Sequence, residues 1–341
     1  MTNSLNALKI SNLRTSFFTR AGEACAVNGI NLTVGKGEIV GLVGESGSGK
    51  TVTGFSIMGL IDEPGRIVEG SIELNGEDLV KASSKRLAAL RGDRLAMIFQ
   101  DPMMTLNPVM RIDEQMMETI LIHHKVSKKE ARIRSQKALE AVGIPSAADR
   151  LKAYPHELSG GMRQRVAIAI ALINNPDVII ADEPTTALDV TIQAQILYLV
   201  RDLARNHDTG LIWVTHDLGV AAEIANRIAV MYAGRIVEQG PANEILDRPR
   251  HPYTEGLIRS LPEGQDDLAR LYQIPGMTPS LLNLPKGCPF APRCERAAEL
   301  CHETLPDERN DGVVRYRCHY PSHLNSGGTL GSDQMAGGQP V

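Results

Sequence analysis

The sequence predicts an α/β fold built around a largely parallel sheet, and three observations carry that prediction. Short runs rich in β-branched residues alternate with longer helical runs from about residue 7 to residue 260. A glycine-rich segment follows one of the short runs, and polar residues follow the others. The short runs that are candidates for buried strands are Glu38 to Val43, Leu95 to Phe99, Val178 to Ala181 and Leu211 to Thr215. Ligands of such sheets bind beyond the carboxyl ends of the strands, so we expect these polar residues to share one edge.

Length and charge limit the classes of protein that fit. A chain of 341 residues is long enough for two or three folded units at roughly 100 to 200 residues each. The 36 basic and 40 acidic residues give a net charge of −4, which argues against nucleic acid as a partner. The sequence has no apolar stretch of about 18 residues and no secretory signal pattern. We therefore expect a cytoplasmic protein that depends on other chains for any membrane crossing.

The predicted domains follow from shifts in pattern. Residues 1–260 form an α/β domain, with a helical insertion at about 101–175 and an antiparallel hairpin near Ala229 to Val237. Residues 261–321 are rich in proline and hold four of the five cysteines, which indicates a small C-terminal domain. Residues 322–341 are rich in glycine and serine, so we expect a disordered tail.

The glycine-rich segment after the first predicted strand is a phosphate-binding motif. It matches G-x-x-x-x-G-K-[ST] in full, as Gly44, Glu45, Ser46, Gly47, Ser48, Gly49, Lys50 and Thr51. Its glycines allow backbone N–H groups to surround phosphates at a helix N-terminus. Lys50 would reach the β and γ phosphates of a nucleotide, and Thr51 would hold Mg²⁺.

Other strand ends supply residues for nucleotide hydrolysis. Asp182 is placed to position Mg²⁺, and the adjacent Glu183 to act as the general base on the attacking water. Gln100 and His216 follow two other strands and would contact that water and the γ phosphate. A further anion-binding helix start is formed by Ser159, Gly160 and Gly161. Two phosphate-binding devices in one chain suggest a dimer with composite sites.

The four clustered cysteines, Cys288, Cys294, Cys301 and Cys318, suggest a metal site in a reducing compartment. They contain no C-x-x-C pair, so a zinc ribbon is not the obvious interpretation. A [4Fe–4S] cluster tolerates wider spacings. Zinc remains open, with His302 or His319 as further ligands, as do unligated thiols. Cys25 is predicted to be a packing residue.

Together these motifs resemble, in order, those of ATP-binding subunits of ABC transporters over residues 7–260. The resemblance places Gln100 at the Q-loop, Leu158 to Met162 at the signature, and His216 at the switch. It also places Ala187-Leu188-Asp189 at the D-loop and Phe17, or its neighbour Phe18, at the adenine-stacking position. One departure is Met162, where the commonest signature has Gln. The resemblance implies a P-loop fold that binds ATP and Mg²⁺.

Longer phrases resemble the bacterial dipeptide and oligopeptide importers, closest to the D-type dipeptide subunit, over about residues 7–321. They are Phe99 to Met103, Leu106-Asn107-Pro108, Tyr154 to Leu158 and His251 to Thr254. This resemblance implies a heterodimer with a second ATP-binding subunit, with Ser159 to Gly161 completing the partner's site. It also implies two transmembrane permeases, a periplasmic peptide-binding protein, a place on the cytoplasmic face of the inner membrane, and a [4Fe–4S] cluster.

Alternatives for function remain at this stage. Nickel, an antimicrobial peptide or a glycan fragment would be possible cargoes of the same machinery. A soluble ABC ATPase that acts on ribosomes or DNA is the alternative from another class.

Overall fold

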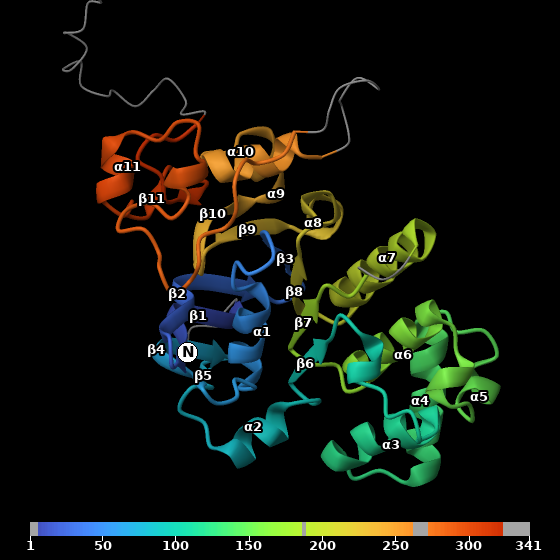
Figure 1. Ribbon diagram of the computed structural model, residues 1–341. Coiled ribbons are helices and arrows are strands. Elements are labelled where there is room, and N and C mark those ends of the chain that lie inside the picture. The colour runs from blue at the N-terminus through green and yellow to red at the C-terminus, as the bar shows by residue number, and fades with distance from the viewer. Residues whose placement is uncertain (1–5, 186–188, 262–271, 323–341) are drawn as a thin grey trace, which may run out of the picture.

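The computed structural model describes residues 6–185, 189–261 and 272–322, which form two sheets with helices around them (Figure 1). The smaller sheet is antiparallel, with the strand order β2-β1-β4-β5. Its strands are β1 (Asn6–Thr19), β2 (Gly22–Gly35), β4 (Gly65–Leu74) and β5 (Glu77–Asp78). Apolar side chains of β1 and β2 pack with those of the larger sheet in one buried cluster. The smaller sheet is therefore joined to the larger one by a shared core.

The larger sheet has the order β11-β12-β10-β9-β3-β8-β7-β6. Its parallel strands are β3 (Ile39–Val43), β6 (Leu95–Ile98), β7 (Val178–Asp182), β8 (Gly210–Thr215) and β9 (Arg227–Tyr232). Strand β10 (Arg235–Pro241) returns antiparallel to β9. The turn residues Ala233 and Gly234 both have positive φ, as a two-residue hairpin of this twist requires. The four predicted strands and the hairpin are confirmed.

Helices occupy the chain between β6 and β7, on the side of the larger sheet away from the smaller one (Figure 1). They are α3 (Ile112–His123), α4 (Lys128–Ala141), α5 (Ala147–Arg150) and α6 (Gly160–Leu172), with 3₁₀ turns at Pro102–Met104 and Pro155–Glu157. Their buried side chains share a cluster with Trp213 of β8. The predicted helical insertion thus packs on the sheet that carries the strand ends.

The remaining helices lie around the two sheets. They are α1 (Lys50–Met58), α2 (Ser84–Leu90), α7 (Val190–Asn206), α8 (Leu218–Ile224), α9 (Ala242–Asp247) and α10 (Pro252–Arg259). Within the described residues, no helix is both long enough and apolar enough to cross a membrane.

The cysteine-bearing segment extends the larger sheet. It holds a 3₁₀ turn (Ala291–Arg293), α11 (Glu299–Glu303), β11 (Arg309–Asn310) and β12 (Arg315–Tyr316). Strand β12 pairs with β10, and Phe290 packs on Tyr232 and Tyr253 in a common core. The boundary at residue 261 stays a prediction. The predicted disordered tail lies, apart from Ser322, outside the described residues.

Candidate functional site: a phosphate loop at the sheet edge

The phosphate loop connects the buried strand β3 to helix α1. Lys50 is the first residue of that helix, and it is buried under its own loop. Its Nζ donates to the carbonyl oxygens of Gly44 at 2.7 Å and Glu45 at 3.0 Å. Burial lowers the pKa of Lys50, and the charges of nearby Glu183 and Asp182 oppose that shift. The ammonium is thus held at the loop where a nucleotide phosphate would lie.

Thr51 and Asp182 meet although they are far apart in sequence. The Thr51 hydroxyl donates to Asp182 Oδ1 at 3.2 Å. Burial raises the pKa of Asp182; the Thr51 hydrogen bond opposes this shift, and the charge of Glu183 adds to it. A hydroxyl and a buried carboxylate are oxygen ligands of the kind that Mg²⁺ takes in nucleotide hydrolases, and a cation there would offset the cost of burying charge. The predicted pair fits Mg²⁺.

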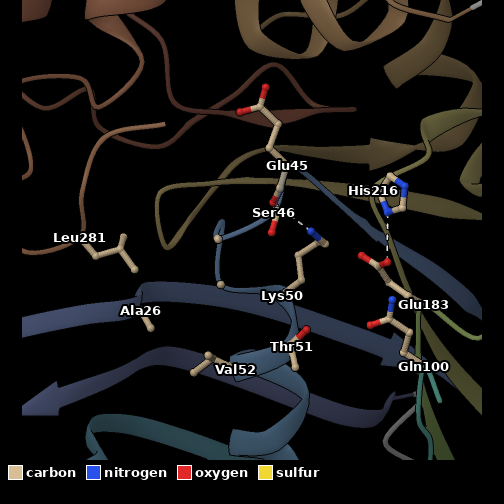
Figure 2. Close-up of a pocket in the computed structure, with 12 residues that line it drawn as sticks. Ala26, Glu45, Ser46, Lys50, Thr51, Val52, Gln100, Glu183, His216 and Leu281 are labelled. Atoms are coloured by element: carbon tan, nitrogen blue, oxygen red, sulfur yellow. Dashed lines mark hydrogen bonds and ion pairs between the residues drawn. The ribbon is translucent and has the colours of Figure 1, made fainter. Parts of the chain in front are cut away.

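Glu183 and His216 form the second part of the site. Glu183 Oε2 lies 3.1 Å from His216 Nδ1, and the two side chains face each other in Figure 2. Glu183 has a φ of 45°, a strained value for a glutamate, and its N–H donates to Val214 O at 2.9 Å. The strand therefore ends in a kink that is held by its neighbour β8. Gln100, two residues after the end of β6, lies beside Glu183 (Figure 2).

These residues surround one open cavity of about 740 Å³, a size that suits a nucleotide. Its lining residues are Ala26, Glu45, Ser46, Gly47, Gly49, Lys50, Thr51, Val52, Gln100, Glu183, His216 and Leu281. Gly44, Ser48 and Asp182 are buried and are not among its lining residues. Sequence reasoning missed Ala26, Val52 and Leu281, because no motif marks an apolar wall.

Some predicted residues lie elsewhere. Phe17 is not among those that line the cavity; its ring packs at Gly65, where an added Cβ would lie 2.6 Å from Phe17 Cε1. Phe18 is partly exposed and lies under the guanidinium of Arg66. The structure thus leaves the adenine-stacking role of Phe17 a prediction.

The signature residues also lie outside this cavity. Ser159 caps helix α6 by accepting from the Met162 N–H at 3.3 Å, and Gly160 is exposed beside it. Asp189 caps helix α7 by accepting from the Ile192 N–H at 3.0 Å. Of the predicted D-loop, Ala187 and Leu188 lie outside the described residues. Within one chain, the second phosphate-binding device is separate from the first.

The phosphate loop has partners that the sequence did not reveal. The Glu45 carboxylate accepts two hydrogen bonds from Arg293, at 2.6 and 2.9 Å, and one from Thr278 at 2.9 Å. The Glu45 N–H donates to the Tyr253 hydroxyl at 2.9 Å. Burial alone would raise the pKa of Glu45, but the bonds from Arg293 and Thr278 outweigh it and lower that pKa. Glu45 is therefore ionised and fixed.

The four clustered cysteines converge on one small cavity. All are free thiols, and burial raises the pKa of Cys318 to about 12. His251 lines the same cavity, and its buried Nε2 has no hydrogen-bond partner in the part of the chain that the structure describes. Among the described residues, no three His, Cys, Asp or Glu side chains are placed to hold a single metal ion.

Comparison with known proteins agrees with this geometry. A family model described as ABC transporter matches residues 27–186, and one described as oligopeptide/dipeptide transporter, C-terminal region, matches residues 237–301. The oligopeptide transport ATP-binding protein OppD of Salmonella typhimurium is 50% identical over 88% of this chain and 90% of its own length. AppD of Bacillus subtilis, also named an oligopeptide transport ATP-binding protein, is 49% identical over 88% of this chain and 92% of its own.

Solved structures agree as well. The ATP-binding cassette MJ0796, a dimer in a post-hydrolysis state with ADP and Pi, superimposes with a TM-score of 0.62 at 28% identity, covering 69% of this chain and 98% of the cassette. CbiO1 of Clostridium perfringens, part of the transporter complex cbiONQ, gives 0.61 at 26% identity, covering 71% and 91%. The predicted α/β P-loop fold is confirmed. This chain is therefore an ATPase of the ABC transporter family, from the branch that carries the oligopeptide/dipeptide transporter C-terminal region.

Proposed function

We propose that this chain hydrolyses ATP to energise the import of oligopeptides or dipeptides across a bacterial inner membrane. The observation that carries the proposal is that one chain combines two features. It has a nucleotide cavity lined by residues suited to hydrolysis, and it has the C-terminal region of peptide transporters. The relatives OppD and AppD are oligopeptide transport proteins by name. The net charge of −4 disfavours the alternative of an ATPase that works on nucleic acid. Cargo such as nickel or a glycan fragment would use the same ATPase chemistry.

The side chains divide the chemistry among them. Lys50 and the loop N–H groups bind the β and γ phosphates, while Thr51, Asp182 and Gln100 would hold Mg²⁺, which would supply neutralisation of phosphate charge. Glu183 accepts the proton of the attacking water, and His216 orients the Glu183 carboxylate through the 3.1 Å contact. The kinked end of β7 fixes Glu183 against the cavity, so the base is positioned before the substrate arrives.

We further propose that a second, homologous ATP-binding subunit completes the site. Ser159, Gly160 and Gly161 are exposed or half-buried at the start of α6, away from the cavity of their own chain. A helix N-terminus attracts phosphate, so these residues are suited to the nucleotide of a partner, with Asp189 at the same interface. The solved dimer of a related cassette supports a dimeric assembly, and the relative OppD is a transport ATP-binding protein by name.

The partner permeases are expected to dock beside Gln100. Met104 and Val109 follow Gln100 and are 70% and 79% exposed, which is high for large apolar side chains. They lie between β6 and α3, at the start of the helical insertion. Docking there would link the hydrolytic site to two membrane subunits that receive peptide from a periplasmic binding protein, with this chain on the cytoplasmic face.

Reconstitution tests the proposed function directly. The chain would be co-expressed with its permeases and second ATPase, and the purified complex would be reconstituted into proteoliposomes. We expect this complex to hydrolyse ATP faster when peptide-loaded binding protein is added. Empty binding protein is the control. A chain that purifies without membrane subunits and is stimulated by RNA or DNA would contradict the proposal.

For residues 261–321 we propose a C-terminal domain whose four cysteines hold a [4Fe–4S] cluster. Zinc would need its ligands within about 2.3 Å of one ion, and the described residues do not form such a set. Each thiolate of a cluster binds a different iron, so its four ligands are spread around a larger group. His251 Nε2 beside them, which has no partner among the described residues, suits a polar group in this cavity. The cluster would serve a structural role, because it would cross-link a small segment that needs such a link in order to fold.

Metal analysis tests the cluster. We expect anaerobically purified protein to contain about four iron and four acid-labile sulfide per chain. Cys294→Ala should lose most of both, whereas Cys25→Ala should keep them, because Cys25 is buried in β2, donates to Val27 O at 3.3 Å and does not line the four-cysteine cavity. Zinc in place of iron, or no metal, would refute the cluster.

A further inference from the structure

The segment that carries the four cysteines also contacts the nucleotide site. Arg293 lies in the 3₁₀ turn between Cys288 and Cys294, and its guanidinium reaches Glu45 of the phosphate loop, 248 positions away. The pair is bidentate, with Nη1 to Oε2 at 2.6 Å and Nη2 to Oε1 at 2.9 Å. Paired, planar bonds of this kind fix orientation as well as distance. The cysteine segment therefore holds a part of the ATP site.

Arg293 is itself held tightly from both sides. Its Nε donates to Pro275 O at 2.8 Å, and its Nη1 donates to the Tyr232 hydroxyl at 3.3 Å. The side chain is only 5% exposed. Its backbone N–H donates to Phe290 O at 2.9 Å, and the next residue, Cys294, donates to Ala291 O at 3.2 Å. A shift of the cysteine loop would therefore move the guanidinium.

Glu45 connects Arg293 to Lys50, the lysine placed to bind phosphate. Its carboxylate is held by Arg293, while its own carbonyl oxygen accepts from Lys50 Nζ at 3.0 Å. Leu281, from the same C-terminal segment, lines the nucleotide cavity beside the loop. The path from cysteine loop to ammonium thus consists of Arg293, Glu45 and Lys50, each in direct contact with the next.

We propose that Arg293 is a positioning residue that makes nucleotide affinity depend on the state of the four-cysteine site. A filled site fixes the loop from Cys288 to Cys294 and so holds Arg293 on Glu45. An empty site releases that loop, weakens the pair and lowers the affinity for ATP. Coupling between two sites is reciprocal, so bound nucleotide also stabilises the filled cysteine site. This proposal rests on the proposed function in one respect: it takes the four-cysteine site to hold its cluster in the active protein.

Nucleotide affinity in the full-length chain tests the pair itself. We expect Arg293→Ala to raise the Kd for a fluorescent ATP analogue about tenfold, within the range typical of coupled sites. Glu45→Gln should act in the same direction, and the double variant should be no worse than the worse single one, because the pair is lost once only. Arg293→Lys keeps the charge and should recover part of the affinity, which a general folding defect would not allow.

Arg296 provides the matched control. It lies on the same loop, two residues after Cys294, but pairs with Glu255 of α10 at 3.0 Å and not with the phosphate loop. Arg296 also lines the four-cysteine cavity, so iron is assayed in parallel, and Arg296→Ala protein that keeps its iron should have a Kd within about twofold of the wild type. Additive effects of the Arg293 and Glu45 substitutions, or an equal effect of Arg296→Ala, would overturn the positioning role.

Coupling to the cysteine site needs one more comparison. Protein stripped of iron should bind the analogue about tenfold more weakly than loaded protein. In the Arg293→Ala background, stripping should add no further loss. Equal affinity of loaded and stripped wild type would refute the coupling, whereas protein that never contains iron would refute the proposed cluster instead. The iron assay and the affinity assay therefore separate the two failures.

Discussion

Glu183→Gln should reduce ATP hydrolysis by about 10²- to 10⁴-fold, the usual contribution of a general base, while ATP binding is kept. The amide has the same shape as the carboxylate, and it can still meet His216 at the observed 3.1 Å. It cannot accept the proton of the attacking water. Lys50 and the rest of the phosphate loop are unchanged, so the ground-state contacts to ATP remain.

Three measurements check this result. Steady-state phosphate release should fall, the Kd for ATP should stay within about threefold of the wild type, and size-exclusion chromatography with ATP should show a lasting closed assembly with the second ATPase. Glu223→Gln makes the same chemical change at an exposed position of α8 and should alter none of them. Near-normal turnover of Glu183→Gln would remove Glu183 from the role of base.

The parts of the site that the sequence predicts are those set by local pattern. Each of the strands β3, β6, β7 and β8 is a short apolar run, and a parallel sheet brings the residues after such runs to one edge. That rule was enough to bring Asp182 to Thr51 and Glu183 to His216, across 131 and 33 positions of sequence. Strand order was not needed for the prediction, because every order of parallel strands leaves their carboxyl ends on the same side.

The parts that the sequence did not reveal depend on packing between distant segments. Arg293 and Thr278 reach Glu45 only because the C-terminal segment folds back over β10 and α10. No spacing rule distinguishes Arg293 from its neighbour Arg296, which turns toward α10. Leu281 lines the nucleotide cavity, but no motif in the sequence marks this apolar residue. The adenine-stacking role of Phe17 stays a prediction, because the resemblance gives the position of Phe17 in the sequence, whereas packing at Gly65 places its ring.

The phosphate loop itself depends on a glycine that admits no side chain. Gly49 has a φ of +106°, and an added Cβ would lie 2.2 Å from the backbone oxygen of Ala26 and 2.7 Å from Met231 Cε. Ala26 belongs to the long strand β2, so its carbonyl cannot move aside without disturbing the smaller sheet. Gly49→Ala should therefore displace the start of α1 and with it Lys50.

We expect Gly49→Ala to weaken ATP binding about 100-fold, equivalent to about 2.7 kcal/mol, and to lower the free energy of unfolding by about 3 kcal/mol through strain and overpacking. Gly76→Ala separates the clash from the strain. Gly76 also has a left-handed φ, +87°, but a Cβ there meets nothing within 4 Å, and the residue lies in the turn before β5. That control should lose only about 1 kcal/mol of unfolding free energy and keep its ATP affinity. Because both substitutions impose a similar backbone cost, an equal loss of ATP binding in the two variants would show that general destabilisation, and not the contact of residue 49 with Ala26, weakens ATP binding.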